Sequence, residues 1–322
     1  MKSGGRLPVL ENETDLTNNR DDMIENISAV NSQENSLRDT MPAILDILLI
    51  DRTTSTTRTK KNIIWANENY NRYGFKDYSS EAQMKPNLVT GIHSQLIMPR
   101  ALKSRELQKK RTKSKAEVFT PTWIVKKQND AVDKGYQNDD LETYVNRTWL
   151  EITCGEAPYM ASRYDMATGE IMPFSERVGF LDRKLKRINT EVEDKAEWQR
   201  LAKAAFKSSY GFEWSGDSLL LARENLLYTY HDYYYAKWLE GPLYGMFEDI
   251  AEIISYNLFQ MDGLKYIIPF SEKKKKNMNQ QLSLFDDKDP QVQLPIKPGK
   301  RVKIMNWKTN KMEFFDKRVK EL

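Results

Sequence analysis

Hydrophobic and polar positions along the chain alternate in blocks that predict strands and helices in turn. Short apolar runs that carry an acidic residue at or near their end lie at residues 149–152 and 210–214, as expected of buried strands that lead into a loop. Apolar side chains recur at helical spacing in residues 196–209, 218–235 and 243–259. This alternation predicts an α/β fold in which helices flank a layered sheet.

The two ends of the chain show different patterns. Two apolar runs at 43–50 and 61–66 predict a hairpin of paired strands, and residues 178–182 could form a short strand or a lid. Residues 1–40 are polar with scattered apolar positions, which predicts a disordered tail. The predicted organisation is a tail at 1–40, a hairpin and basic region at 41–115, a central domain at 116–270, a polar linker at 271–300 and a small C-terminal hairpin at 301–322.

Composition narrows the functional classes. The 322 residues carry a net charge of +4, which permits an anionic partner without requiring one. A single cysteine, Cys154, excludes an intrachain disulfide, and two distant histidines, His93 and His231, make a metal site implausible. We therefore expect no metal and a reducing compartment. Because no run of about 18 apolar residues occurs, we also expect a cytoplasmic protein without a membrane partner.

A dense basic segment precedes the central domain. Basic side chains recur between residues 103 and 115, and each could neutralise a phosphate of a nucleic-acid backbone. A solvated helix face explains the same charge run equally well. The residues that we predict to contact DNA are Lys109, Lys110, Arg111, Lys113 and Lys115.

Two stretches predict a ligand site at the ends of strands. Thr120 can cap a helix, and Pro121 suits its first turn. The loop after the first strand, which contains Thr153, Cys154, Gly155 and Pro158, has the turn residues that let a backbone press against a ligand. In this loop Cys154 is better explained as a small buried side chain than as a nucleophile.

Three acidic residues follow the predicted strands. In open α/β sheets a nucleotide-like ligand lies across the carboxyl ends of the strands, where an acid after the second strand can bind both ribose hydroxyls. Glu213 has that position, Glu151 would meet the amino-acid end of the ligand, and Asp262 could accept an adenine amino group. Each acid alone is more often a solvated loop carboxylate. The prediction therefore depends on all three acids following successive strands along the chain.

Together these stretches resemble a known family. Phe119-Thr120-Pro121, Glu151 to Tyr159, Glu213 with the segment 222–226, and Asp262-Gly263-Leu264 are similar to the S-adenosylmethionine half of adenine-N6 DNA methyltransferases of restriction-modification systems, over residues 105–268. The resemblance implies a Rossmann-like methyltransferase sheet. It also implies that Phe119, Thr120, Pro121 and the glycine loop hold the methionine moiety, Glu213 the ribose and Asp262 the adenine.

The chain departs from the family pattern in two places. Glu156-Ala157 replaces the usual Ser-Gly pair, which would fill space and add charge near the cofactor. The interval from Glu151 to Glu213 is longer than a strand-helix-strand unit requires, so either an insertion lies between them or Asp182 is the ribose acid. We favour Glu213, because the Ala-Arg-x-Asn-Leu helix follows it.

The catalytic tetrapeptide of the family is missing. Methylation of an exocyclic amine requires a flipped base that is held by polar groups and an aromatic ring. Family members use Asp, Asn or Ser, then Pro-Pro and an aromatic residue, but this sequence contains no Pro-Pro, and Asp51, the best acid nearer the N-terminus, lacks prolines. Three interpretations follow: the cofactor-binding subunit of a split enzyme, a complete but divergent enzyme, and an inactive binding module that regulates or evades a defence system.

The linker carries a short apolar segment. Gln281, Leu282, Leu284 and Phe285 belong to a pentapeptide, Gln-Leu-Ser-Leu-Phe, similar to the one by which many bacterial proteins dock on the DNA-polymerase sliding clamp. An extended segment that offers Leu and Phe to an apolar groove is a plausible peptide ligand. The alternative is that these side chains pack against the core of their own chain.

Overall fold

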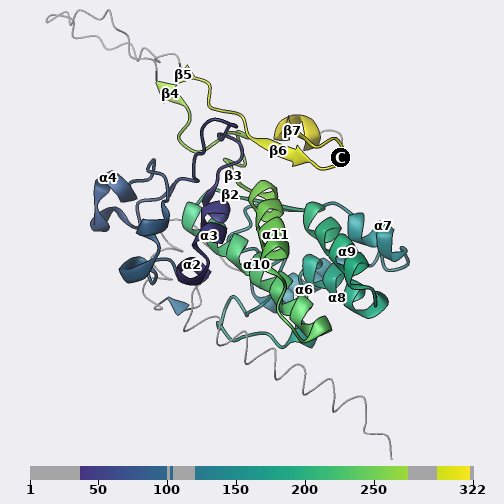
Figure 1. Ribbon diagram of the computed structural model, residues 1–322. Coiled ribbons are helices and arrows are strands. Elements are labelled where there is room, and N and C mark those ends of the chain that lie inside the picture. The colour runs from purple at the N-terminus through teal and green to yellow at the C-terminus, as the bar shows by residue number, and fades with distance from the viewer. Residues whose placement is uncertain (1–36, 100–101, 104–119, 275–295, 320–322) are drawn as a thin grey trace, which may run out of the picture.

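Three short strands form a parallel sheet in the computed structural model, which describes residues 37–99, 102–103, 120–274 and 296–319 (Figure 1). The strands are β1 (Trp149–Glu151), β2 (Ser209–Glu213) and β3 (Leu258–Gln260), in the order β1-β2-β3. Glu151 pairs with Gly211, and Glu213 pairs with Gln260. The prediction of an α/β sheet is confirmed, and the carboxyl ends of its strands lie along one edge.

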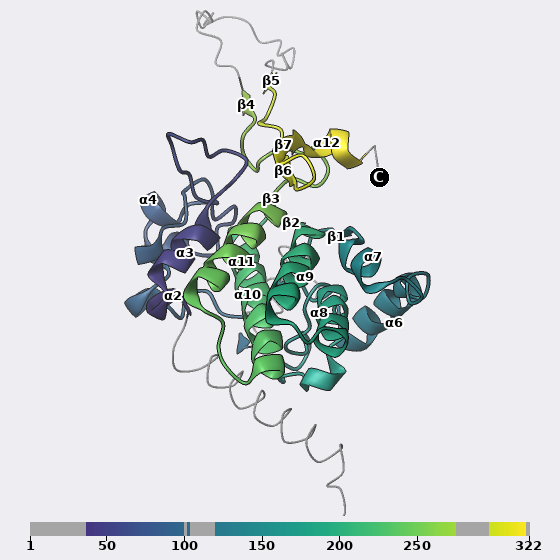
Figure 2. The same ribbon diagram turned by 45° about the vertical axis from the view of Figure 1, so that its right-hand side comes forward.

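Helices connect and cover these strands. Two helices join β1 to β2, α8 (Phe180–Glu191) and α9 (Lys195–Lys207), and two more join β2 to β3, α10 (Gly216–Trp238) and α11 (Tyr244–Asn257). The extra helix accounts for the long interval between Glu151 and Glu213. Before the sheet come α6 (Thr122–Asp133) and α7 (Leu141–Asn146), which lie beside α8 in Figure 2. No helix within the described ranges has both the length and the apolar composition needed to span a membrane.

The N-terminal region differs from its predicted hairpin. Residues Pro42–Leu49 form helix α3, preceded by α2 (Leu37–Thr40), so the paired-strand prediction for 43–50 is wrong. Only an isolated bridge between Ile50 and Asn62 joins the two apolar runs. The buried residues of α3 are spaced for a helix face, and Pro42 suits the first helical turn. The remaining short elements here are η1 (Asn71–Tyr73), α4 (Phe75–Tyr78), η2 (Pro86–Leu88) and η3 (Gly91–His93).

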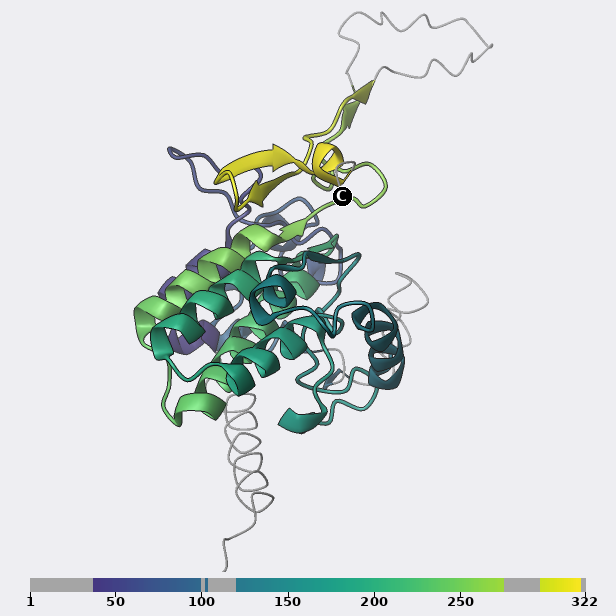
Figure 3. The same ribbon diagram turned by 90° about the vertical axis from the view of Figure 1, so that its right-hand side faces the viewer.

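The C-terminal hairpin is confirmed. Strands β6 (Lys303–Asn306) and β7 (Lys311–Phe314) pair antiparallel and lead into α12 (Phe315–Arg318). Before them, β4 (Lys273–Lys274) pairs with β5 (Ile296–Lys297). In Figure 3 the hairpin lies across the end of the helical layer where the strands are. A second apolar cluster joins it to the sheet, formed by Phe212, Phe259, Met261, Ile268, Val302, Ile304 and Phe315.

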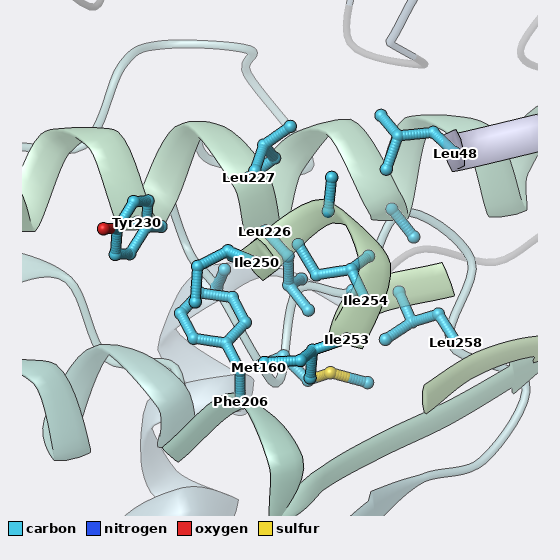
Figure 4. Close-up of a cluster of buried hydrophobic side chains, with 14 of the residues drawn as sticks. Leu48, Met160, Phe206, Leu226, Leu227, Tyr230, Ile250, Ile253, Ile254 and Leu258 are labelled. Atoms are coloured by element: carbon cyan, nitrogen blue, oxygen red, sulfur yellow. The ribbon is translucent and has the colours of Figure 1, made fainter. Parts of the chain in front are cut away.

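The main core surrounds α10 and α11. Figure 4 shows Leu226, Leu227 and Tyr230 of α10 among side chains from five other parts of the chain. The neighbours labelled there are Leu48, Met160, Phe206, Ile250, Ile253, Ile254 and Leu258. Burial of each aliphatic or aromatic side chain stabilises the fold by about 1.5–3 kcal/mol. The core therefore ties the N-terminal helices and the loop after β1 to the same central helix.

One buried cation organises the ends of several elements. The Arg223 guanidinium on α10 donates hydrogen bonds to the carbonyls of Leu48 and of Ile50 (3.0 Å) at the end of α3, and to those of Ser255 (3.2 Å) and Leu258 (2.6 and 3.1 Å) where α11 passes into β3. Burial lowers the pKa of Arg223 to about 9, and the nearby Asp51 opposes that shift. Carbonyls at helix ends lack partners within the helix, so Arg223 satisfies them.

Arg223→Lys tests whether the geometry of the donors, rather than the charge, holds these ends together. A lysine keeps the charge but cannot spread its donors over carbonyls in several directions, so we expect a loss of about 2–4 kcal/mol in the free energy of unfolding. Urea denaturation measures it, with Arg58→Lys at an exposed position as the control. Equal stability of the two variants would contradict the role assigned to Arg223.

Candidate functional site

A cavity of about 910 Å³ lies beside β1 and reaches the carboxyl end of β2. Its volume is in the range of about 300–1,000 Å³ that is typical of small-molecule sites. Three parts of the chain form its walls. They are α6 with Thr120 just before it, β1 with the loop that follows, and the end of β2 with Phe180 of α8 and Ser218 of α10. The lining residues are Thr120, Gln128, Asn129, Val132, Tyr136, Thr148, Trp149, Leu150, Glu151, Ile152, Thr153, Cys154, Gly155, Pro158, Tyr159, Phe180, Glu213 and Ser218.

Most of the predicted cofactor residues meet in this cavity. They come from segments far apart in sequence, and those that line it are Thr120, Glu151, Thr153, Cys154, Gly155, Pro158 and Glu213. Pro121 and Asp262 are not among the lining residues. Phe119 lies outside the described residues, as do the basic residues Lys109, Lys110, Arg111, Lys113 and Lys115 and the segment with Gln281, Leu282, Leu284 and Phe285.

The loop after β1 has an unusual backbone. Thr153, Gly155 and Ala157 all have positive φ, at 46°, 56° and 63°. For a residue with a side chain this conformation costs about 1–2 kcal/mol, so contacts elsewhere must hold the loop in place. Two of these contacts reach β2: the Cys154 N–H donates to the Phe212 carbonyl (2.8 Å), and the Gly155 N–H donates to Glu213 Oε2 (2.9 Å).

The two strand-end carboxyls are held by backbone amides. Glu151 accepts hydrogen bonds from the N–H groups of Tyr159 (3.2 Å) and Met160 (3.0 Å), which folds the loop back over the end of β1. Glu213 accepts from Ser215 N–H (3.0 Å) as well as from Gly155. Burial raises the pKa of Glu151 to about 8, with a further contribution from the charge of Glu213. Burial likewise raises the pKa of Glu213.

Glu156 does not add charge to the cavity as the sequence suggested. Its side chain is buried, and its carboxylate accepts a hydrogen bond from the Tyr164 hydroxyl (2.7 Å). It is not among the lining residues. The expected charge of Glu156 is therefore not found in the lining of the cavity, because the loop turns this side chain into the protein.

Asp182 is excluded as the alternative ribose acid. It lies in the first turn of α8, so residues 178–182 form neither the strand nor the lid that we considered. The carboxylate is fully buried and accepts hydrogen bonds from the N–H groups of Ser162 (2.9 Å) and Gly179 (3.1 Å). An acid three residues after a helix start commonly satisfies such amides, so its role is structural.

The start of α6 is shifted by one residue from its predicted position. The helix begins at Thr122 with Pro121 as its N-cap residue, so Thr120 is not the cap. Instead Thr120 lines the cavity. The Thr122 N–H donates to Asp165 Oδ2 (3.3 Å), which places a carboxylate at the positive end of the helix.

Asp262 and Cys154 have local roles. The Asp262 carboxylate accepts hydrogen bonds from the N–H groups of Leu264 (2.9 Å) and Lys265 (3.1 Å), so it stabilises its own turn after β3. Burial, and then the charge of Glu151, raise the pKa of the Cys154 thiol, which keeps it protonated and unsuited to nucleophilic attack. Among the described residues, no group of His, Cys, Asp and Glu could hold a metal ion.

Sequence reasoning missed the aromatic wall of the cavity. Trp149 stacks on Phe180, with ring centroids 4.9 Å apart, and meets the edge of Tyr136 at 6.3 Å. Gln128 and Val132 are four residues apart on α6, so they share a helix face, and Tyr136 lies in the turn that follows the helix. That spacing was visible in the sequence, but the approach of α6 to β1 was not.

Comparison of the chain with protein-family models, with curated proteins and with solved structures finds no match. What the cavity can bind therefore has to be inferred from the residues that line it.

The loop also depends on a side chain of α10. Asn225 Nδ2 donates hydrogen bonds to the carbonyls of Glu156 and Ala161, each at 3.1 Å. Asn225 belongs to the Ala-Arg-x-Asn-Leu segment, and it is buried. Its amide therefore fixes both ends of the turn that follows Gly155.

Asn225→Asp tests this attachment with almost no change in shape. A carboxylate oxygen would face two carbonyl oxygens in place of the amide donor, so we expect the free energy of unfolding to fall by about 2–3 kcal/mol. Urea denaturation gives the value. Asn87→Asp, at an exposed position, is the control and should change stability little. A loss no greater than that of the control would show that the loop does not need Asn225.

Proposed function

We propose that the cavity beside β1 binds S-adenosylmethionine, and that the chain is the cofactor-binding part of an adenine-N6 DNA methyltransferase of restriction-modification type. The observation that carries this proposal is the convergence of Thr120, the loop from Thr153 to Pro158, and Glu213 on one cavity. These are the segments for which the sequence resembles that family. The parallel order β1-β2-β3, with helices between the strands, is compatible with a Rossmann-like sheet.

Most of the predicted residues fit a part of this cofactor, but Asp262 does not. Glu213 lies after the second strand, where a carboxylate can accept hydrogen bonds from ribose hydroxyls. The backbone around Gly155 and the Thr120 side chain would hold the methionine moiety, and Tyr136, Trp149 and Phe180 offer ring faces for stacking. Asp262 is occupied by its own turn, so the adenine amino group would need another acceptor. When bound, the cofactor supplies an activated methyl group.

The edge of β1 supports the view that the chain is incomplete without a partner. In a parallel pair alternate residues direct their N–H and C=O groups to the neighbouring strand. The Trp149 N–H bonds to the Ser208 carbonyl on the β2 side, so Leu150 directs its backbone groups the other way. Within the described residues β1 ends the sheet on that side, and residues 148–153 line the cavity there. A strand supplied by a partner could pair with this edge.

A split enzyme accounts for the missing catalytic tetrapeptide, because the partner would bring it together with target recognition. DNA binding through Lys109, Lys110, Arg111, Lys113 and Lys115, clamp docking through the segment 281–285 and a cytoplasmic location remain parts of this proposal. The second candidate is a methyltransferase-like module without transfer activity that acts by docking, for example against a defence system. The absence of Pro-Pro from the sequence and the turned-away Asp262 favour it.

Titration calorimetry with S-adenosylmethionine is the first test. We expect micromolar binding by the purified chain and a loss of at least about tenfold in Gly155→Leu, because Gly155 lines the cavity with a positive φ that a leucine disfavours. Tritiated methyl transfer to DNA, with and without co-expressed products of adjacent genes, then separates the candidates. Transfer only with a partner supports the split enzyme, and binding without transfer in either case supports the inactive module. Absence of binding would overturn both.

Leu150→Pro tests the edge of β1. Proline removes the N–H that faces away from β2 and leaves the β1–β2 hydrogen bonds intact, as proline on an edge strand can. We expect cofactor binding to remain within about threefold and partner-dependent methyl transfer to fall at least about tenfold. Leu150→Ala loses the same side chain but keeps the N–H, and should retain transfer. Equal behaviour of the two variants would exclude strand pairing at this edge.

A further inference from the structure

The described lining of the cavity includes acidic side chains but no basic ones. Two carboxyls line it, that of the buried Glu151 and that of the half-buried Glu213, and none of its described lining residues is Lys, Arg or His. A phosphate chain would meet no compensating charge from the described residues, and burying an uncompensated charge is costly. The walls therefore disfavour nucleotides with phosphate chains.

The aromatic residues of the cavity also favour a cationic ligand. Tyr136, Trp149, Tyr159 and Phe180 all contribute to the lining. The face of an aromatic ring is the negative part of its quadrupole and attracts cations, most strongly where water is excluded. The Tyr136 ring also attracts a cation of the protein itself, since Arg147, which does not line the cavity, lies 4.5 Å from its centroid.

We propose that the cavity selects ligands that carry a positive charge, with Glu151 and Glu213 as the groups that neutralise it. This inference rests on the proposed function and names the property by which the site would distinguish the sulfonium cofactor from its neutral thioether product. The two molecules share the adenosine, the amino group and the carboxylate, so the sulfonium charge and its methyl group are the whole difference between them.

Proton binding gives this selectivity a pH dependence. The raised pKa values mean that Glu151, with a pKa of about 8, and Glu213 are protonated in the empty cavity over more of the pH range than ordinary carboxyls. A cation favours their ionised forms, so its affinity is highest above pH 8 and falls as the pH is lowered. The other titratable or charged groups near these carboxyls are Tyr136, Cys154, Tyr159, Asp217 and Arg223.

The test compares three probes by titration calorimetry at pH 6 and pH 8.5. They are S-adenosylmethionine, S-adenosylhomocysteine and the analogue in which a carbon bearing an ammonium group replaces the sulfonium. At pH 8.5 we expect both cations to bind at least about tenfold more tightly than the thioether, and this ratio to shrink at pH 6. Because all three probes carry the same amino acid group, its own titration cancels in the ratio.

Glu213→Gln removes a negative charge and a ribose acceptor together, so it should weaken binding of all three probes and bring the affinities of the cations and the thioether to within about threefold of each other. Glu156→Gln is the matched control, since it removes a carboxyl of the same loop that faces Tyr164 and not the cavity. Should Glu213→Gln fail to fold, the pH series on the unaltered chain still decides. Equal affinities for all three probes overturn the charge selectivity and leave the proposed function in place, whereas no binding of any probe overturns the proposed function.

Discussion

The structure depends on polar residues buried in the middle of α10. Arg223, Glu224 and Asn225 follow one another, so they point in three directions around the helix axis. A buried polar group without a partner is costly, and each of the three therefore needs a separate partner segment. Arg223 holds the ends of α3 and α11, Glu224 forms a bidentate pair with Arg38 at 2.6 and 2.7 Å, and Asn225 holds the loop after β1.

This arrangement explains how a strained loop can persist at the site. Thr153 and Ala157 adopt backbone conformations that side chains disfavour, and Cys154 and Ala157 anchor the loop in the main core. Its amides are bound by Glu151 and Glu213, and its carbonyls by Asn225. The carboxyls thus have a structural task, since they accept the N–H groups that shape the loop. Both residues also line the cavity.

Sequence reasoning succeeded where a general rule of sheet geometry applies. Glu151 and Glu213 could be placed together because the carboxyl ends of parallel strands meet at one edge of a sheet. The run at 43–50 was mistaken for a strand because a short apolar segment fits a buried helix equally well, and only the spacing of Ile44, Leu45, Leu48 and Leu49 distinguishes them.

The rest of the site could not be predicted, because it depends on which segments meet in space. The direction of the Glu156 side chain depends on the positive φ values of Thr153 and Ala157. The sequence does not indicate them, because residues with side chains rarely adopt this conformation. Phe180 reaches the cavity only because α8 starts at the residue after Gly179, whose position is fixed by contacts with Met160 and Ser162. Asp262 misses the cavity because β3 ends at Gln260 and the chain turns at once, which leaves the carboxylate to bind that turn.

An exposed strand edge is usually a liability, since it can pair with any other extended chain. Here the second apolar cluster covers one face of the sheet and α9, α10 and α11 pack near the other, while α6 stands across the cavity from β1. Within the described residues, this edge therefore lies in the wall of the cavity. On the proposed function, a ligand at the carboxyl end of β1 and a strand along its side would share the wall formed by residues 148–153. Two binding events that share a wall are energetically coupled, and such coupling is reciprocal: a cofactor that orders this wall favours the partner strand to the same degree that the strand favours the cofactor.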